Sequence, residues 1–205
     1  MEMTQVAPLA HYLAGCDIVQ VEDPRIQALA IELRGGSNDE EFARRAFEHV
    51  RDEIAHSFDA DDPRVTVTAR EVLDAGVGLC YAKSHLLAAL LRAGGVPTAL
   101  CYQWLGEGDD FMLHGLVAVR LEGGWHRQDA RGNKPGVDAQ FSLAQEQLAW
   151  PVRRELGERD LLTLHIAPPQ NLVRLLRSVE DVRTLGEGRL GIFPAMSDVT
   201  KYQCL

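Results

Sequence analysis

The chain has 205 residues, of which 46% are hydrophobic and 25% are charged, and its formal net charge is −9. This balance is ordinary for a globular protein with one good core, and a negative chain is a poor partner for a phosphate backbone. No run approaches about 18 consecutive apolar residues, the length that a membrane-spanning helix needs. We therefore expect neither a nucleic-acid partner nor a membrane partner.

The N-terminal sequence and the cysteines indicate in which cellular compartment the protein is located. The opening "MEMTQVAPLAHYL" lacks the basic and apolar regions of a secretory signal peptide. The four cysteines are spread along the chain without a CxxC pair, which does not suggest a disulfide framework; they are Cys16, Cys80, Cys101 and Cys204. These features predict a cytoplasmic protein in a reducing environment.

Two helices are predicted near the N-terminus. The first spans residues 23–36, with Asp23 as its cap and Pro24 in its first turn, and it ends at a glycine pair. The second spans 37–58, because apolar residues recur at helical spacing and Ser37 with Glu40 has the pattern of a capping box.

Two more helices follow an aspartate-rich loop. Thr68 and Glu71 form a second capping-box pattern before the short helix "AREVLDAG". The last of the four begins near Cys80 and ends at Gly94–Gly95.

The hydrophobic period then changes to that of strands. Residues 96–105, 111–121 and 124–130 read as strands and are separated by turns that contain Gly or Asp. Helices followed by consecutive strands predict an α+β domain in which the helices pack on an antiparallel sheet.

The C-terminal part is expected to be an extension of the same domain. Residues 167–185 read as one helix after a Pro-Pro turn, and 186–198 read as irregular structure. We assign 1–166 to the main domain and 167–205 to an extension packed on it.

Cys80 has the sequence setting of a nucleophile. In "AGVGLCYAKSHLLAALLRAGG" it follows Gly76 and Gly78 and opens the helix pattern. The N–H groups and dipole at a helix N-terminus favour a thiolate, and the same N–H groups can form part of an oxyanion hole. We expect the two glycines to let the backbone turn and to leave space for a substrate.

His114 and Asp129 are the candidate partners of this thiol. His114 lies in the strand pattern "FMLHGLVAVRL", and Asp129 ends the next one, "GWHRQDA". A hairpin about residues 122–124 pairs 117 with about 129, so a bulge or a longer turn is needed to bring the two side chains together. Asp129 would then orient the imidazole toward Cys80 in triad geometry.

These segments together resemble the bacterial transglutaminase-like superfamily. The resemblance is carried by "VRDEI", "TAREVLDAGVGLC", "LLAALLRAGGVP", a histidine within an apolar strand, and "W…DA", and it covers roughly residues 24–135. It implies a papain-like cysteine proteinase fold and a Cys-His-Asp triad, which falls on Cys80, His114 and Asp129. Nothing in the sequence demands a metal or an organic cofactor.

One departure concerns the oxyanion hole. Relatives often carry a tyrosine where this chain has His56, so the additional oxyanion donor of the family is not identified here. Tyr81 is given no role.

Other reactive side chains receive structural interpretations. His126 is expected on the surface, facing away from Asp129, and His85 is expected to be structural because no further metal ligands accompany it. Lys83 is not part of a phosphate-binding loop, since Ala82 stands where that motif needs glycine. Cys101 is expected in the core.

The implied chemistry is acyl transfer through a thioester on Cys80, with a peptide or protein as substrate. Attack by water would make the protein a peptidase or amidase, and attack by an amine would make it a transglutaminase. Two alternatives stay open. One is a catalytically silent binding module. The other is an arylamine N-acetyltransferase, although the "RGGxC" approach of those enzymes is replaced here by "VGLC".

Overall fold

The computed structural model describes residues 2–107 and 110–185. Its five α-helices are α1 (Pro24–Arg34), α2 (Asp39–Glu53), α3 (Ala69–Ala75), α4 (Cys80–Ala93) and α5 (Gln170–Arg177). Short 3-10 helices lie at Leu9–Leu13, Arg154–Leu156 and Val182–Leu185.

The main sheet has five strands in the order β1-β7-β4-β5-β6. They are β1 (Thr4–Gln5), β4 (Thr98–Glu107), β5 (Asp110–Leu121), β6 (Gly124–Gln128) and β7 (Arg159–His165). All neighbours run antiparallel except the edge pair β1 and β7, which is parallel. A separate pair, β2 (Ala55–His56) and β3 (Val77–Gly78), is parallel and leads into α4.

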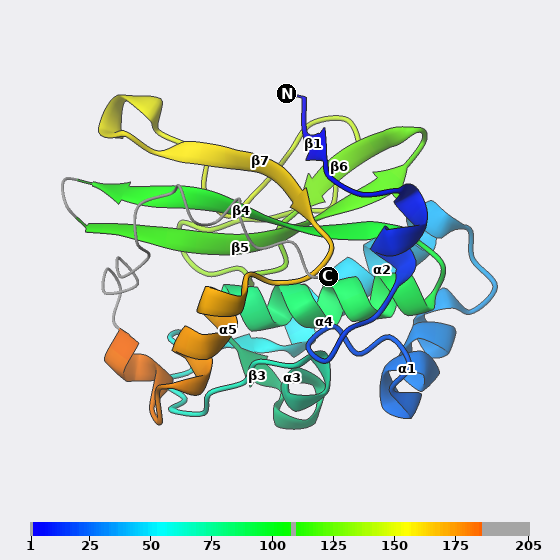
Figure 1. The fold of residues 1–205 in the computed structure, drawn as a ribbon, viewed down its shortest axis with the longest axis horizontal. Coiled ribbons are helices and arrows are strands. Elements are labelled where there is room, and N and C mark those ends of the chain that lie inside the picture. The colour runs from blue at the N-terminus through cyan, green and yellow to red at the C-terminus, as the bar shows by residue number, and fades with distance from the viewer. Residues whose placement is uncertain (1, 108–109, 186–205) are drawn as a thin grey trace.

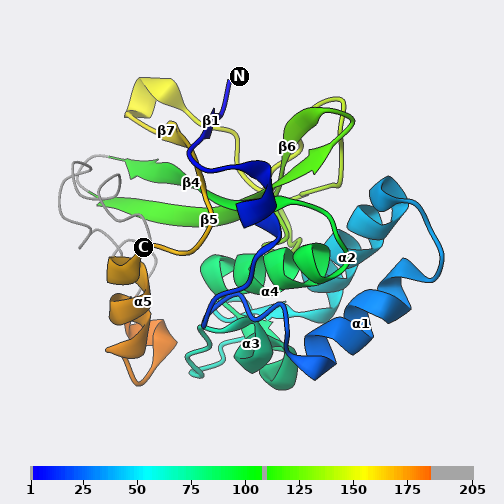
Figure 2. The ribbon, with the colours of Figure 1, turned by 45° about the vertical axis from the view of Figure 1, so that its right-hand side comes forward.

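The helices gather on one side of this sheet, with α4 lying directly along it (Figures 1 and 2). Almost every side chain of α4 is buried, so it is the central helix of the domain. The face toward α4 contributes to the larger core through Leu100, Tyr102, Leu113 and Val117. The opposite face forms a smaller core that includes Ala99, Cys101, Leu116 and Ala118. The predicted α+β, papain-like architecture is confirmed.

Several helix boundaries follow the capping residues expected from the sequence. The Asp23 side chain accepts hydrogen bonds from two N–H groups at the start of α1. Thr68 and Glu71 form a complete capping box at the start of α3. The central helix begins at Cys80 and ends before the glycine pair, as predicted.

The second predicted helix is too long at both ends. Asn38, and not Ser37, caps α2, since its side chain accepts from the N–H of Glu41. The Ser37 hydroxyl instead donates to the carbonyl of Arg34. The helix stops at Glu53, because the next residues leave it to pair with the strand before Cys80.

The sequence did not reveal the edge strand β1 or its neighbour β7. The sequence of β7, "RDLLTLH", does not show the alternation of apolar and polar residues that is typical of a strand, because the charged Asp160 stands at a position that faces into the protein. The predicted helix over 167–185 is broken at Ser178, whose hydroxyl caps α5 by donating to the carbonyl of Leu175. Both parts pack into the larger core through Leu172, Leu176, Val182 and Leu185. Residues 186–205, including Cys204, lie outside the described part of the chain.

Candidate active site

Cys80 is the first residue of α4. Its N-cap, Leu79, offers no side-chain cap, so the N–H groups of the first helical turn are not taken up by a capping side chain. Such N–H groups carry the positive end of the helix dipole and can bind an anion. The Cys80 side chain is nearly buried, at 4% exposure. A thiolate or an oxyanion formed here would therefore be stabilised by backbone donors in a low-dielectric site.

The glycines before Cys80 have structural tasks. Gly76 ends α3 in the left-handed region at φ 66°. A Cβ on Gly78 would lie 3.0 Å from Thr66 Oγ1 and 3.2 Å from Ala82 Cβ. The space around Gly78 is thus filled by the protein itself, and the expectation that it leaves room for a substrate is wrong.

Gly115 is the point where the sheet meets the nucleophile. A Cβ at this position would lie 2.9 Å from Tyr81 Cδ1 and 3.1 Å from Tyr81 Cα, so only glycine permits this approach. The N–H of Gly115 donates to Cys80 Sγ at 3.4 Å. Tyr81 holds the contact from the other side, because its hydroxyl donates to the carbonyl of Leu113.

The structure brings His114 and Asp129 together on one face of the sheet. The turn between β5 and β6 is two residues long, and Val117 pairs with Gln128, so the next residue, Asp129, lies beside Leu116. Side chains two positions apart on a strand share a face, which makes Asp129 the diagonal neighbour of His114. Their hydrogen bond, Nε2 to Oδ2, is 2.8 Å long. Neither a bulge nor a longer turn is required.

The electrostatics of His114 are set by two neighbours. Burial alone would lower the pKa of His114, but the charges of Asp129 and of a Cys80 thiolate outweigh it and raise that pKa to about 10. The second ring nitrogen, Nδ1, is buried and has no hydrogen-bond partner within the described residues. Cys80 lies close enough to His114 for its charge to raise the pKa of the imidazole.

The side chain of Asp129 is buried, and its carboxylate accepts several hydrogen bonds. Its carboxylate accepts the N–H of Arg131 at 3.1 Å and the N–H of Ala149 at 3.0 Å, in addition to His114. Burial would raise the pKa of Asp129, but the interaction with His114 and these two donors hold it below its ordinary value. The residue is therefore an ionised acceptor that orients the imidazole.

A long loop after β6 closes over this pair. Trp150 packs edge-on against the His114 ring, with 5.0 Å between ring centroids. The Arg131 guanidinium lies 5.2 Å from the Trp150 ring centroid and forms a bidentate pair with Asp59. His114 and Asp129 are thereby shielded from solvent.

The residues given structural interpretations lie as follows. Cys101 is buried in the smaller core, and burial raises its pKa. His85 is buried in α4, where Nδ1 lies 2.7 Å from the carbonyl of Val67. His126 is partly buried, and its Nε2 lies 3.2 Å from the carbonyl of Leu121. None of these three joins Cys80, His114 and Asp129.

His56 and Lys83 flank the site. Burial lowers the pKa of His56 to about 3, which keeps its imidazole neutral at pH 7, and its Nδ1 has no partner among the described residues. Lys83 is fully buried one turn after Cys80 and bonds to the carbonyl of Ile54. Burial lowers the pKa of Lys83 to about 7.

Sequence reasoning missed Gly115, Trp150 and Gln103 near the site. A glycine directly after the candidate histidine was a usable signal for close backbone approach. Gln103 was also visible as a polar residue within the apolar strand "TALCYQWL". Trp150 carried no signal, because it lies in an irregular segment far from the motifs.

Two absences hold for the residues that the structure describes. They contain no group of three or more His, Cys, Asp or Glu side chains placed to hold a metal ion. Within the same ranges, no helix combines the length and apolar character needed to cross a bilayer.

Comparison with solved structures gives related folds. A candidate cysteine protease from Cytophaga hutchinsonii aligns over 60% of this chain and 42% of its own length, with a TM-score of 0.51 and 17% identity. The periplasmic domain of TgpA from Pseudomonas aeruginosa aligns over 60% of this chain and 48% of its own, with a TM-score of 0.47 and 21% identity. A TGase aligns over 84% of this chain and 49% of its own, with a TM-score of 0.44 and 14% identity. This chain thus spans less than half of each of these proteins.

Sequence comparison identifies the family. No curated protein sequence is similar enough to count as a match. The model of the transglutaminase-like superfamily matches residues 27–130, which include α4 with Cys80, His114 and Asp129. The chain belongs to the transglutaminase-like superfamily.

Proposed function

We propose that this protein is a cysteine hydrolase or acyltransferase that acts on a peptide or isopeptide amide through a thioester on Cys80. The observation that carries the proposal is the arrangement in the middle of β5. Gly115 donates its N–H to Cys80 Sγ, while the neighbouring His114 is held by Asp129.

The chemistry follows from these positions. His114 takes the thiol proton, and the sulfur of Cys80 attacks the amide carbon to give a tetrahedral oxyanion. The backbone N–H groups at the start of α4 are placed to stabilise that charge. The C–N bond then breaks, His114 returns the proton to the leaving amine, and the acyl group stays on sulfur. Water or a second amine resolves the thioester, with the proton again passing through His114.

The choice between water and an amine belongs to this proposal. Each acceptor needs the same base, so Cys80, His114 and Asp129 serve a peptidase and a transglutaminase equally. The family membership agrees with both. We also propose a reducing compartment such as the cytoplasm, since Cys16, Cys80 and Cys101 are all free thiols.

The test is the rate at which iodoacetamide alkylates Cys80 as a function of pH, read by mass spectrometry. Because the pKa of His114 is raised to about 10, its imidazole is protonated at neutral pH and favours a neighbouring thiolate. We expect fast alkylation that is nearly flat from about pH 6 to pH 9. An isolated thiol would react slowly until the pH approaches about 8.5.

Two variants make this result specific. His114→Ala should lower the alkylation rate at pH 6 by at least about ten-fold, because the cation beside the sulfur is lost. His126→Ala is the matched control and should leave the profile unchanged. A profile that rises only near pH 8.5 and is the same in all three proteins would contradict the catalytic proposal and favour a binding module.

A further inference from the structure

Lys83 is a buried lysine that the proposed chemistry does not use. Its side chain is 0% exposed and lies in the first turn of α4, one turn after Cys80. Lysine is almost never fully buried unless it is paired. Among the residues that the structure describes, the hydrogen-bond partners of its amino group are backbone carbonyls and no carboxylate. So unfavourable a placement indicates a specific task.

The amino group of Lys83 caps the end of α2. Its Nζ donates to the carbonyl of Ile54 and, at 3.4 Å, to the carbonyl of Arg51. The last carbonyls of a helix have no partner within that helix, and a buried one is costly to leave unpaired. The side chain of Lys83 therefore fixes the position of the end of α2 against α4.

The same amino group lies against the loop after β6. A Cβ on Gly132 would lie 3.3 Å from Lys83 Nζ and 3.4 Å from the carbonyl oxygen of Arg51, so the backbone of the loop packs closely on both. Gly132 has φ 112°, a conformation that glycine favours. Arg51 adds a second link to this loop, because its Nη1 donates to the carbonyl of Ala139 at 3.2 Å. Three segments of the chain thus meet at Lys83 Nζ.

Two of these segments carry parts of the candidate active site. The helix α4 carries Cys80, and the backbone N–H of Lys83 donates to the carbonyl of Leu79, the cap directly before Cys80. The loop carries Asp129, whose carboxylate accepts at 3.1 Å the N–H of Arg131, the residue before the glycine. A shift of Lys83 would therefore move the sulfur and the orienting carboxylate relative to one another.

These contacts do not depend on the charge of Lys83. Burial lowers the pKa of Lys83 to about 7, and the charge of Arg131 acts in the same direction, whereas the carboxylate of Asp129 opposes it. A neutral amine keeps two N–H groups, one for each of the two carbonyls. The link between the segments is therefore the same on both sides of neutral pH, which agrees with the flat alkylation profile expected for the wild-type protein.

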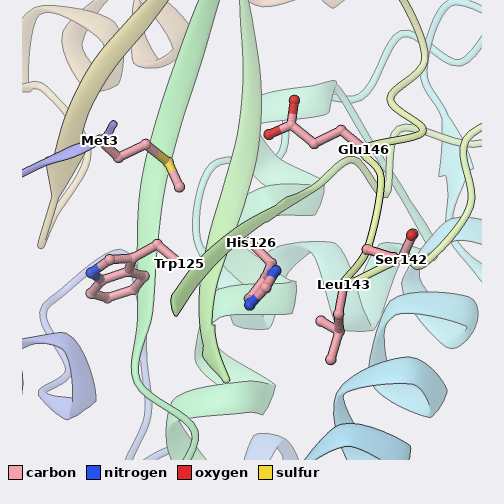
Figure 3. A pocket seen from close by; sticks show the side chains of 7 residues that line it. Met3, Trp125, His126, Ser142, Leu143 and Glu146 are labelled. Carbon is pink, nitrogen blue, oxygen red and sulfur yellow. The ribbon is translucent and has the colours of Figure 1, made fainter. Parts of the chain in front are cut away.

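A hollow of about 340 Å³ at β6 offers no comparable feature (Figure 3). The described residues that line it include no lysine or arginine. Its polar side chains have partners, since Trp125 donates to Gln5 and Glu146 pairs with Arg127. This hollow therefore leaves no buried cation to explain.

We propose that Lys83 is a positioning residue of the reaction, which holds Cys80 and the loop that carries Asp129 at the separation that thioester formation needs. This inference rests on the proposed function. Lys83 acts through Leu79 on the side of the sulfur and through Gly132 on the side of the carboxylate, and not on the reacting atoms themselves. An error of about 1 Å in such a placement lowers a rate by about 100-fold.

The experiment acetylates Cys80 with p-nitrophenyl acetate and follows the burst of p-nitrophenolate, corrected with Cys80→Ala. Lys83→Met keeps the length of the side chain but removes its N–H donors, and we expect the burst rate to fall by about 10- to 100-fold. Arg92→Met is the matched control, because Arg92 is a buried cation in the last turn of α4 that also donates to carbonyls, those of Thr98 and Ala14. Both variants should lower the melting temperature, but Arg92→Met should leave the burst rate unchanged.

The pH profile of Cys80 alkylation separates positioning from a loss of stability. When the loop is displaced, Asp129 stabilises the protonated form of His114 less well, so the neighbouring thiolate is favoured less. In Lys83→Met we expect alkylation at about pH 6 to fall by about ten-fold relative to that at about pH 9. The profile of Arg92→Met should stay flat.

Gly132→Ala tests the same contact from the loop and decides the question if Lys83→Met does not fold. Its methyl group would lie 3.3 Å from Lys83 Nζ, and we expect the burst to slow by about ten-fold. Gly136→Ala is the control, since Gly136 also has a positive φ, 85°, but a Cβ there would meet nothing within 4 Å. Both variants strain the backbone, and only Gly132→Ala should slow the burst.

The outcomes separate this inference from the proposed function. If Lys83→Met matches Arg92→Met in burst rate and pH profile, or if Gly132→Ala matches Gly136→Ala where Lys83→Met does not fold, then Lys83 only caps α2. The positioning role is then refuted while the proposed function stands. If the wild-type protein gives no burst above Cys80→Ala, the proposed function itself fails, and the positioning role with it.

Discussion

The two halves of the candidate active site are held in different ways. The nucleophile half is built from neighbours in the chain. Thr68 and Glu71 cap α3, and Thr66 Oγ1 donates to the carbonyl of Val77 just before Cys80. The acid–base half is held by residues far apart in sequence, such as Ala149 bonded to Asp129 and Arg131 paired with Asp59. The first half can form locally, whereas the second requires the loop after β6 to close.

This difference shows where the site is vulnerable. A change in the nucleophile half should mainly cost stability, because its parts support one another over short stretches of chain. A change in the acid–base half should mainly cost chemistry, because one carboxylate both orients the imidazole and anchors the loop. The predictions below test that division.

The largest effect is expected for Asp129→Asn. The amide carries no charge to keep the pKa of His114 raised, and burial then favours the neutral ring. Acylation of Cys80 by p-nitrophenyl acetate should fall by roughly 10⁴-fold, the order seen when the orienting acid of a triad is neutralised. Burst kinetics measure it, with the exposed Asp39→Asn as control. A rate within about three-fold of wild type would show that Asp129 only anchors the loop.

Gly115→Ala tests the place where the two halves meet. The added methyl group would lie 2.9 Å from Tyr81 Cδ1 and 3.1 Å from Tyr81 Cα, so β5 must shift away from α4. We expect a loss of about 1–3 kcal/mol in the free energy of unfolding. Slower acylation should accompany it, since the N–H leaves Cys80.

Denaturant titration and burst kinetics together read out this variant. Gly124→Ala is the control in the same sheet, because its Cβ would meet only the end of the His126 side chain. Equal stability of the two alanine variants would show that the close approach at Gly115 is not required.

The smallest effect is expected for Thr68→Ala. Removing the capping hydroxyl should lower the free energy of unfolding by about 1 kcal/mol and the melting temperature by about 2–4 °C. Ser37→Ala is the informative comparison, since Ser37 has the same sequence pattern but does not cap α2. Differential scanning calorimetry separates them. If Asn38→Ala costs nothing while Ser37→Ala costs as much as Thr68→Ala, the cap of α2 has been misassigned.

The sequence was most informative where local signals decide the structure. The cap at Thr68, the start of α4 at Cys80 and the stop at its glycines all depend on residues within one or two turns. The capping-box pattern at Ser37 and Glu40 predicted the wrong cap for α2, because the next residue, Asn38, is also a good capping residue and takes that role. It also failed at Ala55–His56, because pairing with β3 overrides helix propensity.

The acid–base half was only partly accessible from the sequence. The strands that carry His114 and Asp129 could be predicted, but their register differed by one residue from the expected one, and the diagonal contact depends on that register. Trp150 and Ala149 reach the site through a loop without periodic structure. Their contacts are tertiary, so no local pattern could place them.

The shared oxygen of Asp129 has a consequence for how the protein is made. Oδ2 accepts both His114 Nε2 and the N–H of Ala149. During synthesis, Cys80 and its helix leave the ribosome well before Ala149 does, and chains emerge and fold from the N-terminus. A nascent chain therefore carries its thiol before it can assemble the paired imidazole. Under the proposed function, the acid–base partner of Cys80 is therefore assembled only when nearly the whole domain has emerged.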